Sequence, residues 1–215
     1  MPTLDDLIPS NTFVGTSLIL RRGDRFLYGI RPIMMAGRTQ ILELTGIGGG
    51  LEKEDESYTA GVRREAIEET GSDVTIVDCA STWIVPGRQQ VEQITLTGDR
   101  RPAALVYRHH RTPPRQPWHP DNQGAAWLIV YLGELQDEPT PTMELPWLIW
   151  LSAAQVQQTA HDDVPLRDLL LHGAELITRP ADPPPSPAAM TRLTDSQEAL
   201  ALALGERTVA VYESW

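Results

Sequence analysis

Residues 64–71 read REAIEETG, and they constrain the fold and function of this chain more than any other stretch. On a helix with about 3.6 residues per turn, Glu65, Glu68 and Glu69 fall on one face that is roughly 100° wide. Like charges four residues apart destabilise a helix slightly, and glutamates late in a helix oppose its dipole. Three acids on one face therefore need either open solvent or a cation.

The residues around the acids indicate where this helix begins and ends. Ser57 is a residue type that commonly caps a helix N-terminus, and Gly71 is one that commonly ends a helix. Val62 and Ala66 lie beside the acidic face, so a second face can pack on a sheet. The pattern predicts a helix over residues 57–70 with one apolar and one acidic side.

The acidic face permits two interpretations. One is a solvated helix surface that binds no metal, which is the ordinary role of an isolated acidic pattern. The other is a site for a hard cation, because carboxylates at positions i, i+3 and i+4 converge within reach of Mg²⁺ or Mn²⁺, which prefer oxygen ligands. The helix alone does not separate the two, and the residues that precede it favour the metal site.

Those preceding residues complete a longer pattern. It runs from Gly50 through five residues to Glu56, then through seven residues to the stretch 64–71. This pattern resembles the Nudix box, the signature of the Nudix hydrolase family, at every charged position and at both glycines. Three positions depart from it: Ala66 is small for its apolar position, Ser72 stands where an aliphatic residue is usual, and Gly48 stands where many members have proline. None of these departures removes an acidic residue of the box.

The resemblance implies specific roles for the residues of the box. The metal ligands that it implies are Glu65, Glu69, Glu68 and the carbonyl group of Gly49, with Mg²⁺ or Mn²⁺ as the cofactor. Glu68 is either a ligand or the general base. Arg64 and Glu56 are expected to form an internal ion pair that fixes the loop to the helix, in the way that outer residues orient metal ligands.

A further acid is expected outside the box. Nudix enzymes often place another carboxylate ahead of a Trp-apolar-Ser run that opens a late helix. Glu144 precedes such a run here and stands six residues before Trp150. We predict that Glu144 is a further metal ligand or the general base, and the alternative is a solvated glutamate in a loop. Glu134 and Glu138 compete for the same role.

Two segments are candidates for binding the substrate. Glu92 follows a Pro-Gly pair in a pattern similar to that of ADP-ribose pyrophosphatases of the same family, although the spacing is one residue longer. The stretch 107–119 gathers arginines and histidines, with Arg108 or Arg111 suited to hold a phosphate and Trp118 suited to stack on a base. The alternatives are an ordinary turn for the first segment and a proline-rich loop with solvated charge for the second.

Hydrophobic patterning predicts a mixed sheet with a few helices, which is an α/β or α+β class. The family resemblance implies an α/β/α sandwich with a short C-terminal appendage. We expect one domain over residues 1–178, a proline-rich linker over 179–190 and the appendage over 191–215, with a helix at 194–205. The strands expected are a hairpin at 13–32 and segments at 39–50, 73–85, 90–97, 103–110, 125–135 and 145–152; further helices are expected at 152–159 and 164–177.

Composition narrows the function classes. The formal net charge of −11 argues against a general nucleic-acid or membrane-surface binder, because both need a basic face. The single cysteine, Cys79, excludes an internal disulfide, and its apolar neighbours predict a buried core residue. No signal peptide or membrane-spanning stretch is recognisable, so a cytoplasmic location is expected.

Taken together, the resemblance implies a metal-dependent hydrolase that cleaves the diphosphate linkage of a nucleoside diphosphate joined to another group. A Nudix fold that senses a nucleotide without turnover is the alternative, and an acidic helix without metal is a third. A homodimer is also expected from the family, with residues 191–215 as a surface that could be exchanged between chains.

Overall fold

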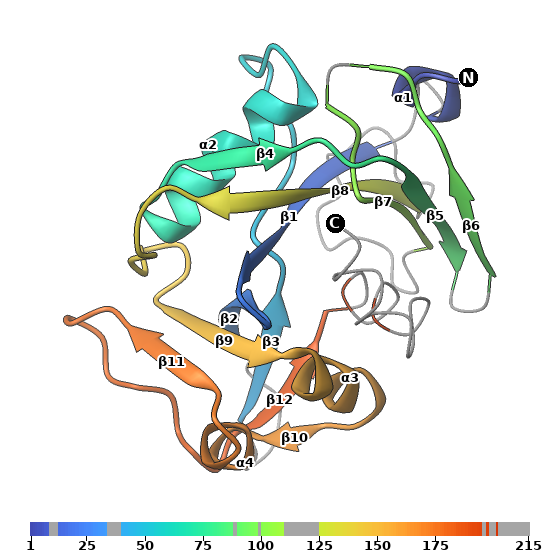
Figure 1. The fold of residues 1–215 in the computed structure, drawn as a ribbon. Coiled ribbons are helices and arrows are strands. Elements are labelled where there is room, and N and C mark those ends of the chain that lie inside the picture. Colours follow the sequence, from blue (N-terminus) through green and yellow to red (C-terminus); the bar gives the residue numbers. More distant parts are fainter. Residues whose placement is uncertain are drawn as a thin grey trace.

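A computed structural model describes residues 1–8, 13–33, 40–87, 90–98, 100–109 and 125–194, together with residues 197 and 201. Its secondary structure confirms a mixed α+β fold, with strands before and after the helix at Tyr58–Thr70 (Figure 1). The elements in chain order are α1 Leu4–Leu7, β1 Phe13–Arg22, β2 Arg25–Ile33, β3 Ile41–Thr45, α2 Tyr58–Thr70, β4 Val74–Val77, β5 Thr82–Gly87, β6 Gln90–Ile94, β7 Ala104–His109, β8 Ala125–Leu135, β9 Trp147–Ser152, α3 Ala153–His161, β10 Val164–Pro165, α4 Leu166–Leu171, β11 Glu175–Thr178 and β12 Met190–Leu193.

The strands form one hydrogen-bonded network whose main path runs β10-β12-β3-β2-β1-β8-β7-β5-β6. Strands β1 and β8, β5 and β7, and β3 and β12 pair in parallel, whereas the other pairs are antiparallel. Off this path, β4 pairs with β8, and β9 pairs with both β2 and β11. The sheet is therefore mixed, as the sequence predicts.

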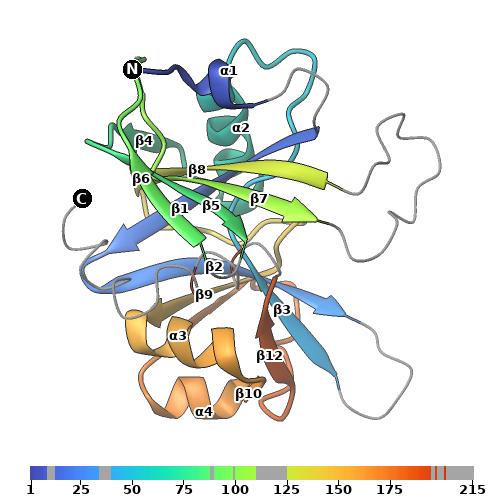
Figure 2. The same ribbon diagram turned by 90° about the vertical axis from the view of Figure 1, so that its right-hand side faces the viewer.

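Alternating side chains of β1 enter two different cores. Leu18 and Leu20 lie in the cluster that contains Val62 of α2, whereas Ile19 lies in the cluster that contains Val156 of α3. A strand that is buried on both faces separates two apolar layers. Figure 2 shows α2 toward one end of the molecule and α3 and α4 toward the other, so helices pack on both sides of the strands.

The expected helix over residues 57–70 is confirmed, and its ends follow from local chemistry. The Ser57 hydroxyl accepts a hydrogen bond from the backbone N–H of Ala60, and Gly71 ends the helix with a left-handed φ of 67°. The hairpin at 13–32 is also confirmed, with Gly23 at a φ of 62° in its turn.

Two expected elements are wrong in extent. The strand at 73–85 is divided into β4 and β5, because Asp78 turns away to accept hydrogen bonds from the backbone and side chain of Arg101. The helix at 164–177 is replaced by β10, the short α4 and β11. Gly173, with a φ of 93°, ends the helical turn and lets the chain enter β11, which pairs with β9.

The expected appendage begins inside the sheet. Residues 191–193 belong to β12, which pairs in parallel with β3 and antiparallel with β10, so they are part of the main sheet. The preceding segment 179–190 contains turns, and its Pro183 carbonyl accepts a hydrogen bond from the indole of Trp147. Most of the expected helix at 194–205 and the remainder of the chain lie outside the described residues, so the expected division into residues 1–178, 179–190 and 191–215 stays a prediction.

Among the helices of the described residues, none is long and apolar enough to cross a membrane.

Candidate metal centre

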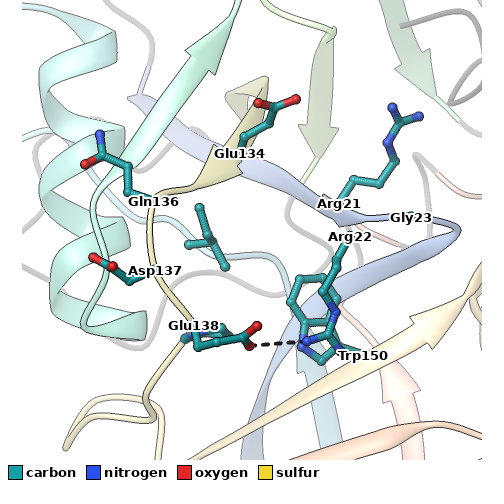
Figure 3. A pocket seen from close by; sticks show the side chains of 10 residues that line it. Arg21, Arg22, Gly23, Glu134, Gln136, Asp137, Glu138 and Trp150 are labelled. Atoms are coloured by element: carbon teal, nitrogen blue, oxygen red, sulfur yellow. Dashed lines mark hydrogen bonds and ion pairs between the residues drawn. The ribbon is translucent and has the colours of Figure 1, made fainter.

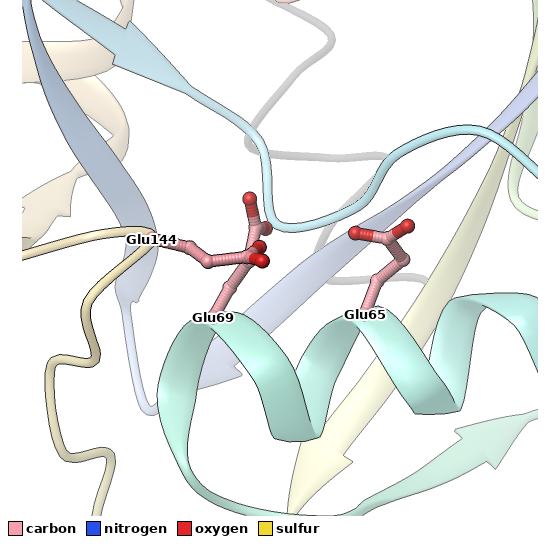
Figure 4. Close-up of side chains that lie close together, drawn as sticks. All are labelled: Glu65, Glu69 and Glu144. Carbon is pink, nitrogen blue, oxygen red and sulfur yellow. The ribbon is translucent and has the colours of Figure 1, made fainter.

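Helix α2 presents two of its acids toward the inside of the protein. Glu65 and Glu69 are one turn apart on this helix and are 9% and 0% exposed (Figure 4). Their neighbours Val62 and Ala66 are fully buried in the core beneath α2. The apolar packing of the helix therefore fixes the direction in which both carboxylates point.

A loop far along the chain brings a third acid to the helix. The backbone N–H of Thr140 donates to the carbonyl of Thr70 at 2.7 Å, and the Thr142 hydroxyl donates to the carbonyl of Glu68 at 2.5 Å. These bonds hold the loop against the C-terminal end of α2, where helix carbonyls lack partners within the helix. Glu144 follows in this loop, and its side chain reaches toward Glu69 (Figure 4).

The three carboxylates meet closely. One oxygen each of Glu65, Glu69 and Glu144 lie within 4.8 Å of one another. Burial is the main cause that raises the pKa of both helix carboxyls, and the pKa of Glu69 rises to about 7. A set of donors made only of carboxylate oxygens matches what Mg²⁺ or Mn²⁺ prefers, and such a cation would offset the crowded negative charge.

The glycine-rich loop packs directly on these acids. The backbone N–H of Gly48 donates to Glu69 Oε2 at 2.8 Å. A β-carbon on Gly49 would lie 2.6 Å from Glu65 Oε1, so only glycine fits here without displacing the carboxylate. The Gly49 carbonyl accepts a hydrogen bond from the backbone of Thr16 at 2.8 Å, and its second lone pair remains available for a ligand bond.

The expected ion pair between Arg64 and Glu56 is wrong, because Asp55 takes that place. The Asp55 side chain is 7% exposed and accepts hydrogen bonds from Arg64 Nε at 3.3 Å and Arg64 Nη2 at 3.1 Å. Asp55 also accepts the backbone N–H of Glu52 at 2.8 Å, which holds its carboxylate inside the loop, whereas Glu56 is exposed. The hydrogen bonds from Arg64 lower the pKa of Asp55.

Arg64 nevertheless joins the loop to the helix, as the resemblance implies. Its Nη2 atom donates to the Gly50 carbonyl at 3.0 Å, and its Nη1 atom donates to Glu65 at 2.9 Å and to Glu68 at 2.8 Å. Glu68 therefore pairs with Arg64 and lies outside the group formed by the other three acids among the described residues. Its expected role as ligand or base stays a prediction.

The two acids that compete with Glu144 lie elsewhere. Glu134 and Glu138 line a pocket of about 530 Å³ beside the turn between β1 and β2 (Figure 3). There Glu138 pairs with Arg22 at 3.2 Å, and the Arg22 guanidinium stacks 4.5 Å from the ring of Trp150. Neither acid belongs to the group around Glu69, so the geometry favours Glu144.

One residue of the centre has no counterpart in the sequence predictions. Arg31, near the end of β2, places its Nη2 atom 2.7 Å from Glu69 Oε1. The two residues are 38 positions apart, and no spacing rule connects a strand arginine with a helix acid at that distance. The register of β2 beside β3, which leads into the glycine loop, brings them together.

The expected substrate residues are placed only in part. Glu92 is exposed on β6, in which it pairs with Ile84 of β5. Arg108 lies on β7, and Arg111 and Trp118 lie outside the described residues. Their expected roles remain predictions.

No protein-family model and no curated protein matches the sequence. Among solved structures, a protein described as a possible asymmetric diadenosine tetraphosphate hydrolase from Jonesia denitrificans is similar at 13% identity, with a TM-score of 0.49 and coverage of 97% of this chain and 98% of that one. A Nudix-family hydrolase from Clostridium perfringens is similar at 15% identity and a TM-score of 0.41, covering 68% of this chain and 84% of that one. A UDP-X diphosphatase is similar at 12% identity and a TM-score of 0.41, covering 70% of this chain and 56% of that one.

Proposed function

We propose that this chain is a Nudix-type pyrophosphohydrolase that uses Mg²⁺ or Mn²⁺. The observation that carries the proposal is the meeting of Glu65, Glu69 and Glu144, two from the helix of the box and one from a loop about 75 residues later. A merely solvated acidic helix gives no reason for a distant loop to place a third carboxylate beside the buried carboxylate of Glu69. The glycine loop that packs on two of these acids supports the same conclusion.

Glu65, Glu69 and Glu144 would hold the cation, with the Gly49 carbonyl as a further ligand. When bound, the cation would polarise phosphoryl oxygens and lower the pKa of an attacking water. The chain itself positions the acids: Gly48 and Arg31 orient Glu69, and Arg64 orients Glu65. Phosphoryl transfer depends mainly on such positioning and charge neutralisation.

The general base is assigned to a carboxylate at the edge of the group. Glu144 is exposed and its carboxylate is close to the other two, so it can reach a water beside the cation. Glu68 is the other candidate, but its carboxylate accepts a hydrogen bond from Arg64. A base must be free to accept a proton, which favours Glu144 over Glu68.

The proposed substrate is a nucleoside diphosphate joined to another group, and the box motif is the support for this class. A fold hosts many substrates, and loops outside the catalytic centre choose among them. Arg108, Arg111, Trp118 and Glu92 remain the proposed contacts. A homodimer built through residues 191–215 also remains a proposal, which the mass of the protein in solution tests.

The function is tested by incubating the protein with a panel of nucleoside diphosphate derivatives and with Mg²⁺ or Mn²⁺. We expect release of a nucleoside monophosphate that stops in EDTA and returns when the metal is restored. Glu138→Gln is the matched control for Glu69→Gln, because Glu138 is an exposed glutamate outside the acid group. Binding of the nucleotides without any turnover would instead support a sensor.

A further inference from the structure

Both oxygens of the Glu69 carboxylate already have a donor. The backbone N–H of Gly48 reaches Oε2 at 2.8 Å, and the Arg31 guanidinium reaches Oε1 at 2.7 Å. The first donor is part of the loop and is fixed. The second is a side chain that can move, and it carries a full positive charge.

The two partners of this ion pair differ sharply in burial. The Glu69 side chain is 1% exposed, whereas the Arg31 side chain is 49% exposed. A buried charge without a partner is costly, so Glu69 needs a cation whenever its carboxylate is ionised. The half-exposed guanidinium keeps much of its hydration beside Glu69 and gains the rest when it returns to solvent. Another cation can therefore take the place of Arg31 beside Glu69.

The other charges around Glu69 are mostly negative. Glu65 and Glu144 each place an oxygen within 4.8 Å of an oxygen of Glu69. Arg64 neutralises part of this charge from the side of Glu65. On the side of Glu69, the described residues supply one ion-pair partner, which is Arg31.

We infer that Arg31 is the internal counter-ion of the metal-free centre and that a divalent cation competes with it for Glu69. The inference rests on the proposed function, since it concerns the metal of that same centre. A divalent cation beside Glu69 would lie a few ångströms from the guanidinium, and like charges at that distance repel each other strongly. A bound metal ion therefore drives Arg31 away from Glu69, or, where Arg31 stays in place, the guanidinium weakens metal binding.

Linkage gives this competition a consequence for the binding of anions. Any anion that draws the Arg31 guanidinium away from Glu69 must tighten metal binding, and metal binding must free Arg31 for an anion to the same degree. The centre thus couples its cation to a negatively charged ligand through one side chain.

The experiment is a titration of the metal-stripped protein with Mn²⁺ alone at about pH 8, at which fewer protons compete for carboxylates. Free Mn²⁺ is counted by electron paramagnetic resonance for the wild type, Arg31→Gln and Arg31→Lys. Arg63→Gln is the matched control, because Arg63 is 50% exposed and pairs with Asp73 away from the acid group. A coupling of the usual size predicts that Arg31→Gln binds Mn²⁺ about 5- to 100-fold more tightly than the wild type.

Arg31→Lys should bind Mn²⁺ nearly as the wild type does, because it keeps the positive charge, and Arg63→Gln should leave the affinity unchanged. The melting temperature of Arg31→Gln in EDTA should be below that of the wild type, and Mn²⁺ should raise it by a larger amount. Equal or weaker Mn²⁺ binding by Arg31→Gln, with normal binding by the wild type, would overturn the inference alone. Absence of Mn²⁺ binding in the wild type would overturn the metal centre itself.

Discussion

The backbone of Gly49 lies against the carboxylate of Glu65, so closely that a β-carbon on Gly49 would be 2.6 Å from Oε1 and 2.7 Å from Oε2. The neighbouring Gly50 has no such restriction, since its β-carbon would meet Phe13 at an ordinary 3.6 Å. Neither glycine has a positive φ, so the difference between them is one of space and not of backbone strain.

We expect Gly49→Ala to displace the Glu65 carboxylate. Loss of a residue that orients a metal ligand weakens metal binding by about 10- to 100-fold, so Gly49→Ala should weaken Mn²⁺ binding by at least that factor. Gly50→Ala should stay close to the wild type in the same Mn²⁺ titration followed by electron paramagnetic resonance. Equal affinities for the two variants would show that the close approach of Gly49 does not shape the centre.

A second prediction concerns the partner of Arg64. Asp55→Asn removes the buried carboxylate that holds the guanidinium, so Arg64 should lose its position on the loop, and metal affinity should fall by about 10- to 100-fold. Glu56→Gln changes an exposed neighbour and should leave the affinity nearly intact. The reverse order of the two effects would restore the Glu56–Arg64 pair that the sequence pattern predicts.

The acid helix was predictable because its signals are local. Ser57 and Gly71 act within a few turns of chain, and the structure agrees with both. The spacing of the glutamates places Glu65 and Glu69 together, whereas Glu68 pairs with Arg64. The partner of Arg64 was not predictable, because the adjacent acids Asp55 and Glu56 differ only in the direction in which the loop points their side chains. Arg31 was missed for a related reason, since its contact with Glu69 depends on strand register.

The C-terminal part shows the same limit of sequence reasoning. A proline-rich stretch resembles a linker between domains. Whether the domain ends there depends on whether the residues that follow form hydrogen bonds with strands that are distant in the chain. Here β12 follows that stretch and pairs with β3, which precedes it by about 150 residues. The short helix α4 likewise ends where Gly173 allows a turn that hydrophobic periodicity does not reveal.

The place of β12 in the sheet leads to a stability prediction. Leu193 is 2% exposed and belongs to the main core, so Leu193→Ala should lower the free energy of unfolding by about 2–5 kcal/mol. Leu171→Ala is the control, because Leu171 is 81% exposed, and it should change that free energy by less than about 0.5 kcal/mol. Urea unfolding measures both. A negligible effect at Leu193 would mean that β12 is not part of the cooperative fold.

The buried thiol of Cys79 gives a prediction about pH. Burial raises the pKa of Cys79 from 9.0 to about 11, so the folded protein holds the thiol proton more tightly than the unfolded chain does. The resulting stability is fully present below about pH 9 and is lost as the pH rises toward 11. At pH 8 the two-unit difference (11 − 9.0 = 2) leaves about 100-fold less thiolate in the folded state.

Labelling with a thiol reagent at pH 8 should therefore be slow in the native protein and fast in denaturant, with the same protein as its own control. Rapid, complete labelling of the native protein would contradict the burial of Cys79.

The central claim is that Glu65, Glu69 and Glu144 form a metal centre that hydrolyses a diphosphate linkage. The most direct measurement is kcat/KM for the best substrate of the nucleoside diphosphate panel, determined with saturating Mg²⁺ for the wild type, Glu69→Gln and Glu138→Gln. Loss of a buried ligand should lower kcat/KM of Glu69→Gln by about 100-fold or more, while Glu138→Gln keeps the wild-type value. Wild-type turnover that survives in Glu69→Gln would contradict the assignment of the centre.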